Sequence, residues 1–261
     1  MQAVTNPLAA HSPAMLRALC RDGGFTGPTA GLGQGHVQAN LMILPAADAF
    51  DFLLFCQRNP RACPLIEVLE PGQFAPRCAP GADIRHDLPG YRVFEHGVMV
   101  RELADVADLW RDDLVTFLIG CSFSFESALI DAGIPLRHVD AGTNVAMFKT
   151  DIACEPAGRF HGNLVVSMRP VKSRDIARAV EISGRFPQVH GAPVHVGHPG
   201  AIGIADLALP DFGDAIAVHD DELPVFWACG VTPQNVVQAS RIPFCISHSP
   251  GRMFVTDLQN S

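Results

Sequence analysis

Gly120-Cys121-Ser122-Phe123-Ser124-Phe125-Glu126 is the stretch around which the chain is organised. Residues 115–119 before it are apolar and partly β-branched, which predicts a strand, and residues 127–133 after it predict a helix that ends at a glycine. A strand that ends in glycine and opens a helix leaves free backbone N–H groups, which can hold a carboxylate or lower the pKa of a thiol. The junction offers four candidate site residues: Cys121, Ser122, Ser124 and Glu126. The alternative is that Cys121 is a buried core residue and Glu126 an ordinary acid of a first helical turn.

The same arrangement occurs once more, near the end of the chain. Residues 224–228 predict a strand that leads into Cys229 and a glycine. Thr232 then predicts a helix start, as an N-cap threonine followed by a proline at the first helical position. Two strand-end thiols, Cys121 and Cys229, would face one pocket; the alternative is two unrelated core cysteines.

Two arginines are candidates for binding a substrate carboxylate, because a guanidinium matches a carboxylate with two parallel hydrogen bonds. Arg85 lies with Asp83 in a loop over residues 79–89, and Arg169 follows a strand predicted for residues 164–168. The alternative for the loop is a solvated turn with local ion pairs. Asn144, in a predicted turn, adds an amide to the candidate set.

The segment from 186 to 204 is dense in histidine, proline and glycine. His195 and His198 would point to opposite faces of a strand, and the segment contains no H-E-x-x-H motif. We therefore expect His195 to bind substrate or to be hydrogen-bonded, and no metal ligands are assigned. The sequence requires no cofactor, and a divalent metal is possible but not indicated.

Composition bounds the class of protein. The chain has 261 residues, 48% hydrophobic and 18% charged, with a formal net charge of -8. It has no basic run for nucleic acid and no apolar stretch long enough for a membrane helix. Eight cysteines without a C-x-x-C pair predict a reduced, cytoplasmic protein, and the N-terminal residues 1–7 lack the features of a secretory signal.

Strands and helices alternate early in the chain, and the part after residue 186 is richer in strands. We expect a single compact α/β (mixed α+β) domain over 1–261, with mixed sheets flanked by helices and two interlocked subdomains, about 1–185 and 186–261. The details include a helix at 106–113 and a short strand at 137–139. A homodimer is the base-rate expectation.

Unusual short sequence motifs, spread over nearly the whole chain, resemble those of a known family. They include Gly27-Pro28-Thr29-Ala30-Gly31, Ile119-Gly120-Cys121-Ser122-Phe123-Ser124-Phe125-Glu126, Pro210-Asp211-Phe212-Gly213-Asp214 and Trp227-Ala228-Cys229-Gly230-Val231-Thr232-Pro233-Gln234. In these motifs the chain resembles the D-glutamate cyclase family, whose bacterial members are classed as hydro-lyases. The resemblance implies closure of D-glutamate to 5-oxo-D-proline with loss of water, and it implies no agreed catalytic residues.

A mechanism for that reaction follows from the residues. Lactam closure needs a base near the ammonium, an acid for the departing oxygen and donors for a developing oxyanion. Glu126 or Asp83 would be the base, and Arg85 or Arg169 would hold the α-carboxylate. The remaining assignments make Cys121 a proton donor or polarising group and place Ser122, Ser124, Asn144, His195, Cys229 and Thr232 in the substrate site. Glu126→Gln is expected to abolish turnover in a folded protein.

Two other functions stay open. Cys121 and Cys229 on opposite sides of an α-carbon would act as base and acid of a cofactor-independent racemase or epimerase of an acidic amino acid. Alternatively, the chain would be a non-catalytic protein that binds a small carboxylate.

Overall fold

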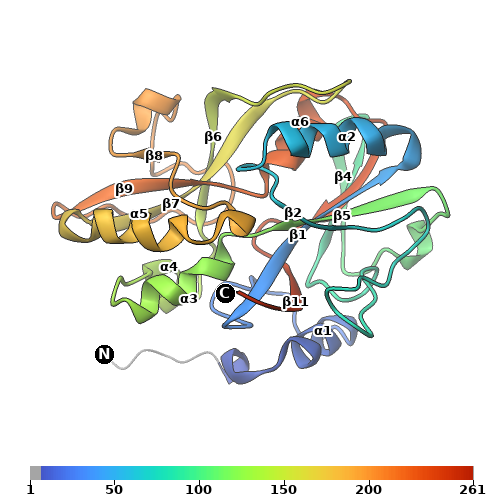
Figure 1. Cartoon of the computed structure of the whole chain (residues 1–261), viewed down its shortest axis with the longest axis horizontal. Coiled ribbons are helices and arrows are strands. Elements are labelled where there is room, and N and C mark those ends of the chain that lie inside the picture. The colour runs from blue at the N-terminus through green and yellow to red at the C-terminus, as the bar shows by residue number, and fades with distance from the viewer. Residues whose placement is uncertain (1–6, 261) are drawn as a thin grey trace.

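Two antiparallel β-sheets with helices packed on them make up the protein (Figure 1). The structure is a computed structural model and describes residues 7–260, so the N-terminal stretch without signal features lies almost wholly outside the described residues. The α-helices of the described part are α1 (Pro13–Arg21), α2 (Ala46–Arg58), α3 (Phe123–Asp131), α4 (Arg137–Ala141), α5 (Ile176–Gly184) and α6 (Thr232–Ala239). Its strands are β1 (His36–Pro45), β2 (Leu65–Val68), β3 (Tyr91–Glu95), β4 (Val98–Leu103), β5 (Leu114–Gly120), β6 (Ala146–Ala153), β7 (Asn163–Lys172), β8 (His195–Val196), β9 (Glu222–Ala228), β10 (Phe244–His248) and β11 (Phe254–Gln259).

The mixed α/β class is confirmed, but the expected mixed sheets are not found. Sheet A has the order β2-β5-β1-β10-β3-β4, with β11 also paired to β1, and sheet B has the order β6-β7-β9-β8. Every strand pair within residues 7–260 is antiparallel. The helical crossovers do not join neighbouring strands of one sheet. Helix α2 links the parallel strands β1 and β2, but β5 lies between them. Helix α6 links β9 of sheet B to β10 of sheet A.

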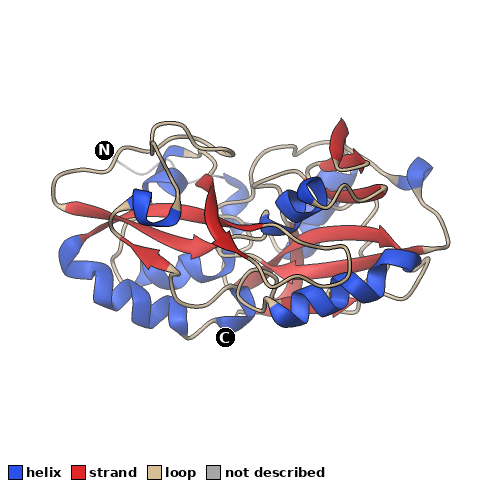
Figure 2. Cartoon of the chain, turned by 90° about the horizontal axis from the view of Figure 1, so that it is seen from above, coloured by secondary structure: helices blue, strands red, loops and turns tan. Residues whose placement is uncertain are grey.

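Sheet B is inserted into the chain of sheet A. Strands β6 to β9 follow β5, and the chain then returns to sheet A with β10 and β11. Figure 2 shows the strands as two groups along the long axis of the molecule. Residues 185–186 are the expected boundary between the two subdomains. Sheet B contains strands from both sides of it, so the two sheets do not divide the chain at that position.

The largest hydrophobic cluster joins both sheets. It contains Phe52 of α2, Phe117 of β5, Met168 of β7 and Phe226 of β9, all essentially buried. The rings of Phe52 and Phe117 meet edge to face with centroids 4.8 Å apart. Apolar side chains from the two sheets are removed from water together, which holds the sheets against each other.

Four local expectations are corrected. Residues 106–113 contain only a 3-10 turn (Ala107–Leu109), and residues 137–139 belong to the helix α4 instead of a strand. Strand β7 does not end at Arg169 but continues to Lys172. Its pairing with β6 stops at Met168, so the missing N–H of Pro170 costs no ladder bond on that side. Thr232 starts α6 without capping it, since Val231 is the N-cap residue and accepts no side-chain bond.

Gly120 closes β5 at a point where two chain segments touch. An ideal Cβ at this position would lie 2.0 Å from the carbonyl oxygen of Gln188. We expect Gly120→Ala to lower the free energy of unfolding by about 1–3 kcal/mol through overpacking. Gly24→Ala is the control, because its Cβ would meet only ordinary contacts at 3.4 Å or more. Equal denaturation midpoints for the two variants would contradict the steric argument.

Candidate functional site

Glu126 and Arg169 form a buried ion pair between α3 and β7. Oε1 of Glu126 accepts hydrogen bonds from Arg169 Nε at 2.9 Å, Arg169 Nη2 at 2.5 Å and His138 Nε2 at 2.9 Å. Arg169 also donates to the hydroxyls of Ser122 and Ser167, both at 3.0 Å. Glu126 and Arg169 are each 1% exposed, so the pair lies in the interior and links the two halves of the molecule.

This pairing changes the roles expected for Glu126 and Arg169. Burial by itself would raise the pKa of Glu126, but the neighbouring His138 and Arg169 lower it below its usual value. A carboxylate with a lowered pKa and three donors on one oxygen is a weak general base. The Arg169 guanidinium is bonded to protein groups, which supports a structural function for the pair, although Glu126 Oε2 has no hydrogen-bond partner among the described residues.

The two strand-end thiols lie in one small apolar cluster. Cys121 and Cys229 share this cluster with Val145, Met253 and other buried side chains, and Cys229 is near enough to help raise the pKa of Cys121. Burial raises the pKa of Cys121 well above its usual value and that of Cys229 to about 11, although a backbone N–H two residues further on opposes each shift. The structure places both thiols in one buried cluster, where burial keeps them protonated at neutral pH; that they face a common substrate pocket stays a prediction.

The remaining predicted site residues near the junctions are tied to the backbone. The Ser124 hydroxyl accepts the N–H of Gln38 at 2.8 Å. The Thr232 hydroxyl accepts the N–H of Val165 at 3.0 Å and donates to the carbonyl of Cys229 at 2.7 Å. Both hydroxyls are buried, so they hold the two strand ends in place.

His195, Asp83 and Arg85 lie elsewhere. His195 is on the two-residue strand β8, bonded to the carbonyl of His198 at 2.9 Å. Arg85 donates twice to the Asp83 carboxylate, at 2.9 and 2.6 Å, and its guanidinium stacks 3.6 Å from the ring centroid of Phe74. Among the described residues, no hydrogen bond or ion pair joins these three side chains to Glu126 or to the thiols, and the loop matches the alternative of a turn with local ion pairs.

A cleft of about 520 Å³ lies between the two halves of the chain. Its walls contain Arg92 and Glu102 from the hairpin of β3 and β4, and Arg252 from the turn before β11. Glu102 accepts from Arg252 Nη1 at 2.8 Å and from Arg92 Nε at 3.4 Å, so two arginines share one carboxylate. From the other half come Asn144 and the loop 210–214.

Two polar groups at this cleft have no hydrogen-bond partner among the described residues. They are the hydroxyl of Ser249, which is 2% exposed, and the side-chain oxygen of Asn144. Glycines make the space around them: a Cβ at Gly90 would lie 2.8 Å from Arg252 Nη1, and one at Gly251 would lie 2.3 Å from Asn144 Oδ1. Unpaired buried polar groups are costly, so these two atoms make the cleft a candidate site for a polar ligand, although other such atoms lie elsewhere in the described residues.

The cleft adjoins the thiol cluster. Phe212 lines the cleft and also packs against that cluster. Of the predicted substrate residues, Asn144 alone lines the cleft; Arg92, Glu102, Ser249 and Arg252 were not predicted. The one signal for them in the sequence is the turn at 249–252, and nothing local connects it to Arg92, which lies far away along the chain.

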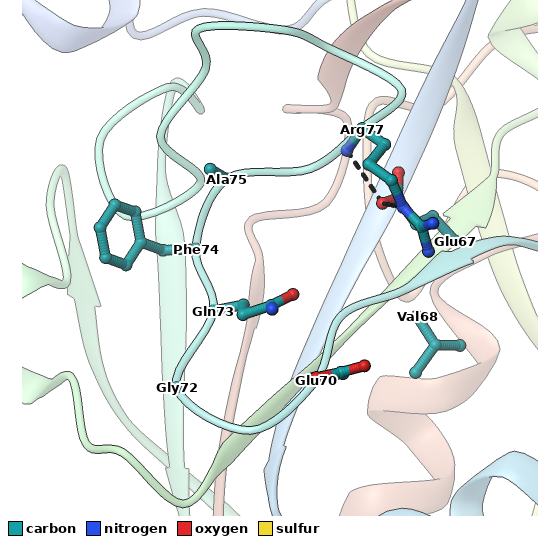
Figure 3. Close-up of a pocket in the computed structure, with 8 residues that line it drawn as sticks. All are labelled: Glu67, Val68, Glu70, Gly72, Gln73, Phe74, Ala75 and Arg77. Carbon is teal, nitrogen blue, oxygen red and sulfur yellow. Dashed lines mark hydrogen bonds and ion pairs between the residues drawn. The ribbon is translucent and has the colours of Figure 1, made fainter.

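A second hollow, of about 650 Å³, lies beside β2 and the loop that follows it (Figure 3). Both oxygens of Glu67 there accept backbone N–H groups, from Arg77 and Cys78 at 2.9 Å. Figure 3 shows the Arg77 side chain lying against Glu67, with which it forms an ion pair at 3.5 Å, and Glu70 further along the loop. None of the predicted site residues lines this hollow, so it is a weaker candidate.

Two further features concern ligands and membranes. Within residues 7–260, no group of three or more histidine, cysteine or acidic side chains is arranged to hold a metal ion. No helix in that range is both long enough and apolar enough to span a bilayer. All eight cysteines are free.

Two buried histidines make stability depend on pH. Burial lowers the pKa of His190 and of His248 to about 4. The unfolded chain therefore binds more protons than the folded one between the ordinary value of 6.5 and about 4, and stability is lost as the pH falls through that window. We expect the free energy of unfolding to drop by about 1.5 kcal/mol per histidine between about pH 6.5 and about pH 5.

Denaturant titrations across this pH range test the expectation. His248→Asn keeps an amide near the position of Nδ1, which bonds the backbone of Leu41, and removes the titrating ring. The variant should show a shallower pH slope than the native chain. An unchanged slope would exclude His248 as a source of the dependence.

The structure is that of a mixed α/β protein with a polar cleft between two antiparallel sheets. The sequence pattern of the family described as "D-glutamate cyclase" matches residues 115–257. The chain belongs to the D-glutamate cyclase family.

Similar chains extend over almost the full length. A protein of Stutzerimonas stutzeri named "Putative hydro-lyase" is 57% identical, over 95% of this chain and 94% of its own. "Putative hydro-lyase YcsI" of Bacillus subtilis is 56% identical, over 95% and 97%, and a protein of the same type from Bordetella petrii is 60% identical, over 94% and 93%. The crystal structure of a nitrogen repressor-like protein from Methanococcus jannaschii has 10% identity and a TM-score of 0.39, which supports no inference.

Proposed function

We propose that this chain is a hydro-lyase that closes a small acidic amino acid, D-glutamate or a close analogue, to 5-oxo-D-proline with loss of water. The reaction would take place in the cleft between the two sheets. Membership of the family and the names of the relatives support the reaction class. The charged and polar lining of the cleft supports a small acidic amino acid as the substrate.

The observation that carries the proposal is the sharing of Glu102 by Arg92 and Arg252. Two guanidinium groups with one carboxylate between them retain N–H donors and one net positive charge for a ligand. A substrate carboxylate fits this arrangement, because charge-assisted bonds from arginine are short and directional. The unpaired Ser249 hydroxyl on the same wall adds a donor for a carboxylate oxygen.

The chemistry balances without an added reactant. The amine nitrogen forms a bond to the side-chain carboxyl carbon, and a carbon–oxygen bond of that carboxyl breaks. Two of the three ammonium protons move to the departing oxygen, which leaves as water. Arginine donors at the carboxyl group would stabilise the charge that develops on its remaining oxygen, and a carboxylate of the cleft would carry the protons.

Incubation of the purified protein with D-glutamate and with L-glutamate tests the proposal. The products are separated by chiral mass spectrometry, with and without a divalent metal. Formation of 5-oxo-D-proline from the D-isomer is the expected result. Unchanged substrate in every reaction would overturn the proposed reaction and favour the reading as a carboxylate-binding protein.

A racemase or epimerase is the second candidate, and the shared cluster of Cys121 and Cys229 favours it. Burial raises the pKa of both thiols, so one of them would have to lose its proton when a substrate binds. Solvent deuterium separates the two reactions. Exchange at the α-carbon would support the racemase, and lactam formation without exchange would exclude it.

A further inference from the structure

We propose that the cleft binds an amino acid across its two walls, with the carboxylate end at Arg92 and Arg252 and the ammonium end at Asp214. Asn144 positions Asp214 for this contact. The inference rests on the proposed function, because it takes the cleft to be the substrate site. It adds the residue that would distinguish an amino acid from a plain diacid.

The two walls of the cleft carry different charges. The wall from sheet A has Arg92 and Arg252 with the shared Glu102, which leaves it net positive. The wall from the inserted half has two carboxylates, Asp211 and Asp214, and no arginine or lysine among the described lining residues. An α-amino acid carries an ammonium group and a carboxylate on one carbon, so the two walls would orient that carbon with its carboxylate toward the arginines and its ammonium group toward the aspartates.

Of the two aspartates, Asp214 is the better partner for an ammonium group. Asp211 accepts the backbone N–H of Lys149 at 2.8 Å, and the ammonium of the same lysine lies 5.8 Å from the centroid of the neighbouring Phe212 ring. Asp214 accepts the backbone N–H of Asn144 at 2.8 Å through Oδ2 alone. Its Oδ1 has no partner among the described residues, and the side chain belongs to an exposed residue of the cleft wall.

The side chain of Asn144 adds a second acceptor to the same wall of the cleft. Its Nδ2 donates to the carbonyl of Pro250 at 3.1 Å, which orients the amide and leaves Oδ1 as an unpaired acceptor. The cleft therefore contains two acceptors without a hydrogen-bond partner among the described residues, Asn144 Oδ1 and Asp214 Oδ1. An ammonium group brings three donors and a positive charge, whereas a carboxylate would be repelled.

Titrations with two ligands that differ only in the amine test this inference. D-Glutamate and glutarate have the same carboxylate spacing, and glutarate lacks the ammonium group. 5-Oxo-D-proline is titrated separately, so that any product formed during the measurement is accounted for. The variants are Asp214→Asn and, as the matched control, Asp220→Asn, which removes an exposed charge outside the cleft lining.

The native protein should bind D-glutamate at least tenfold more tightly than glutarate. Asp214→Asn should bring the two dissociation constants to within about threefold by weakening D-glutamate alone, since asparagine still accepts the Asn144 N–H, and Asp220→Asn should change neither. Equal loss of both ligands in Asp214→Asn, an unchanged ratio, or no saturable binding to the native protein would overturn the inference. If the protein prefers D-glutamate to glutarate but forms no lactam, only the proposed reaction is refuted. If it forms the lactam without preferring D-glutamate, only the present inference is refuted.

Discussion

Glu126→Gln is expected to lower the free energy of unfolding by about 3–5 kcal/mol. The substitution removes the carboxylate that neutralises Arg169, whose side chain is almost completely buried together with that of Glu126. A buried guanidinium without its counter-charge cannot recover the hydration that it lost on folding. Urea denaturation followed by far-UV circular dichroism measures the change.

Two comparison variants separate the buried pair from ordinary charge loss. Glu181→Gln removes a carboxylate from an ion pair with Arg185 in which both side chains are about two-thirds exposed, and it should cost less than about 1 kcal/mol. Adding Arg169→Met to Glu126→Gln should restore part of the lost stability, because no unpaired charge then remains. If Glu126→Gln keeps full stability and loses all turnover, Glu126 is a catalytic base after all, as the sequence alone suggests.

Arg252→Gln is expected to weaken the binding of an acidic amino acid by about 10-fold to 100-fold, which corresponds to the 1.5–3 kcal/mol of a hydrogen bond to a charged group. The variant removes one of the two guanidinium groups that share Glu102 and returns that carboxylate to repel the ligand. The measured quantity is the dissociation constant for D-glutamate, and kcat/KM where lactam forms. The free energy of unfolding should change by less than about 1 kcal/mol, because the side chain is one-third exposed.

Arg101→Gln serves as the control for Arg252→Gln. Arg101 lies on the hairpin of β3 and β4, which also carries Arg92 and Glu102, and its ion pair with Glu95 is long, at 3.7 Å, and about half exposed. It does not line the cleft, so D-glutamate should bind the variant as it binds the native chain. Equal losses in the two variants would mean that general charge, and not the cleft, determines binding.

Local patterns predicted most of the secondary structure. The proline at the first position of α1 and the Ser12 cap, whose hydroxyl accepts the Met15 N–H, mark that helix start as the sequence predicts. The hairpin of β3 and β4 and the strand before Cys121 are also confirmed. The stretch 137–139 was mistaken for a strand because a five-residue helix is too short to show a helical period.

The candidate site was harder to predict, because charge pairing is a property of three-dimensional contact. Arg169 and Glu126 each suit a substrate role when read singly, and the structure pairs them with each other. Arg92 and Arg252 have no local motif, and they become neighbours because sheet A pairs β3 with β10, which leads into the turn at 249–252. Their shared use of Glu102 could not be read from spacing.

The sequence by itself determined the family, the mixed α/β class and the two matching junctions that end in Cys121 and Cys229. Those features depend on local propensity and on the order of residues, which a sequence shows directly. Only the tertiary structure decided that the two sheets of the described residues are antiparallel, that Glu126 pairs with Arg169, and that a cleft with walls of opposite charge opens between the sheets. The physical reason is that burial and electrostatic pairing depend on which distant segments meet, and strand insertion determines those meetings after the local elements have formed.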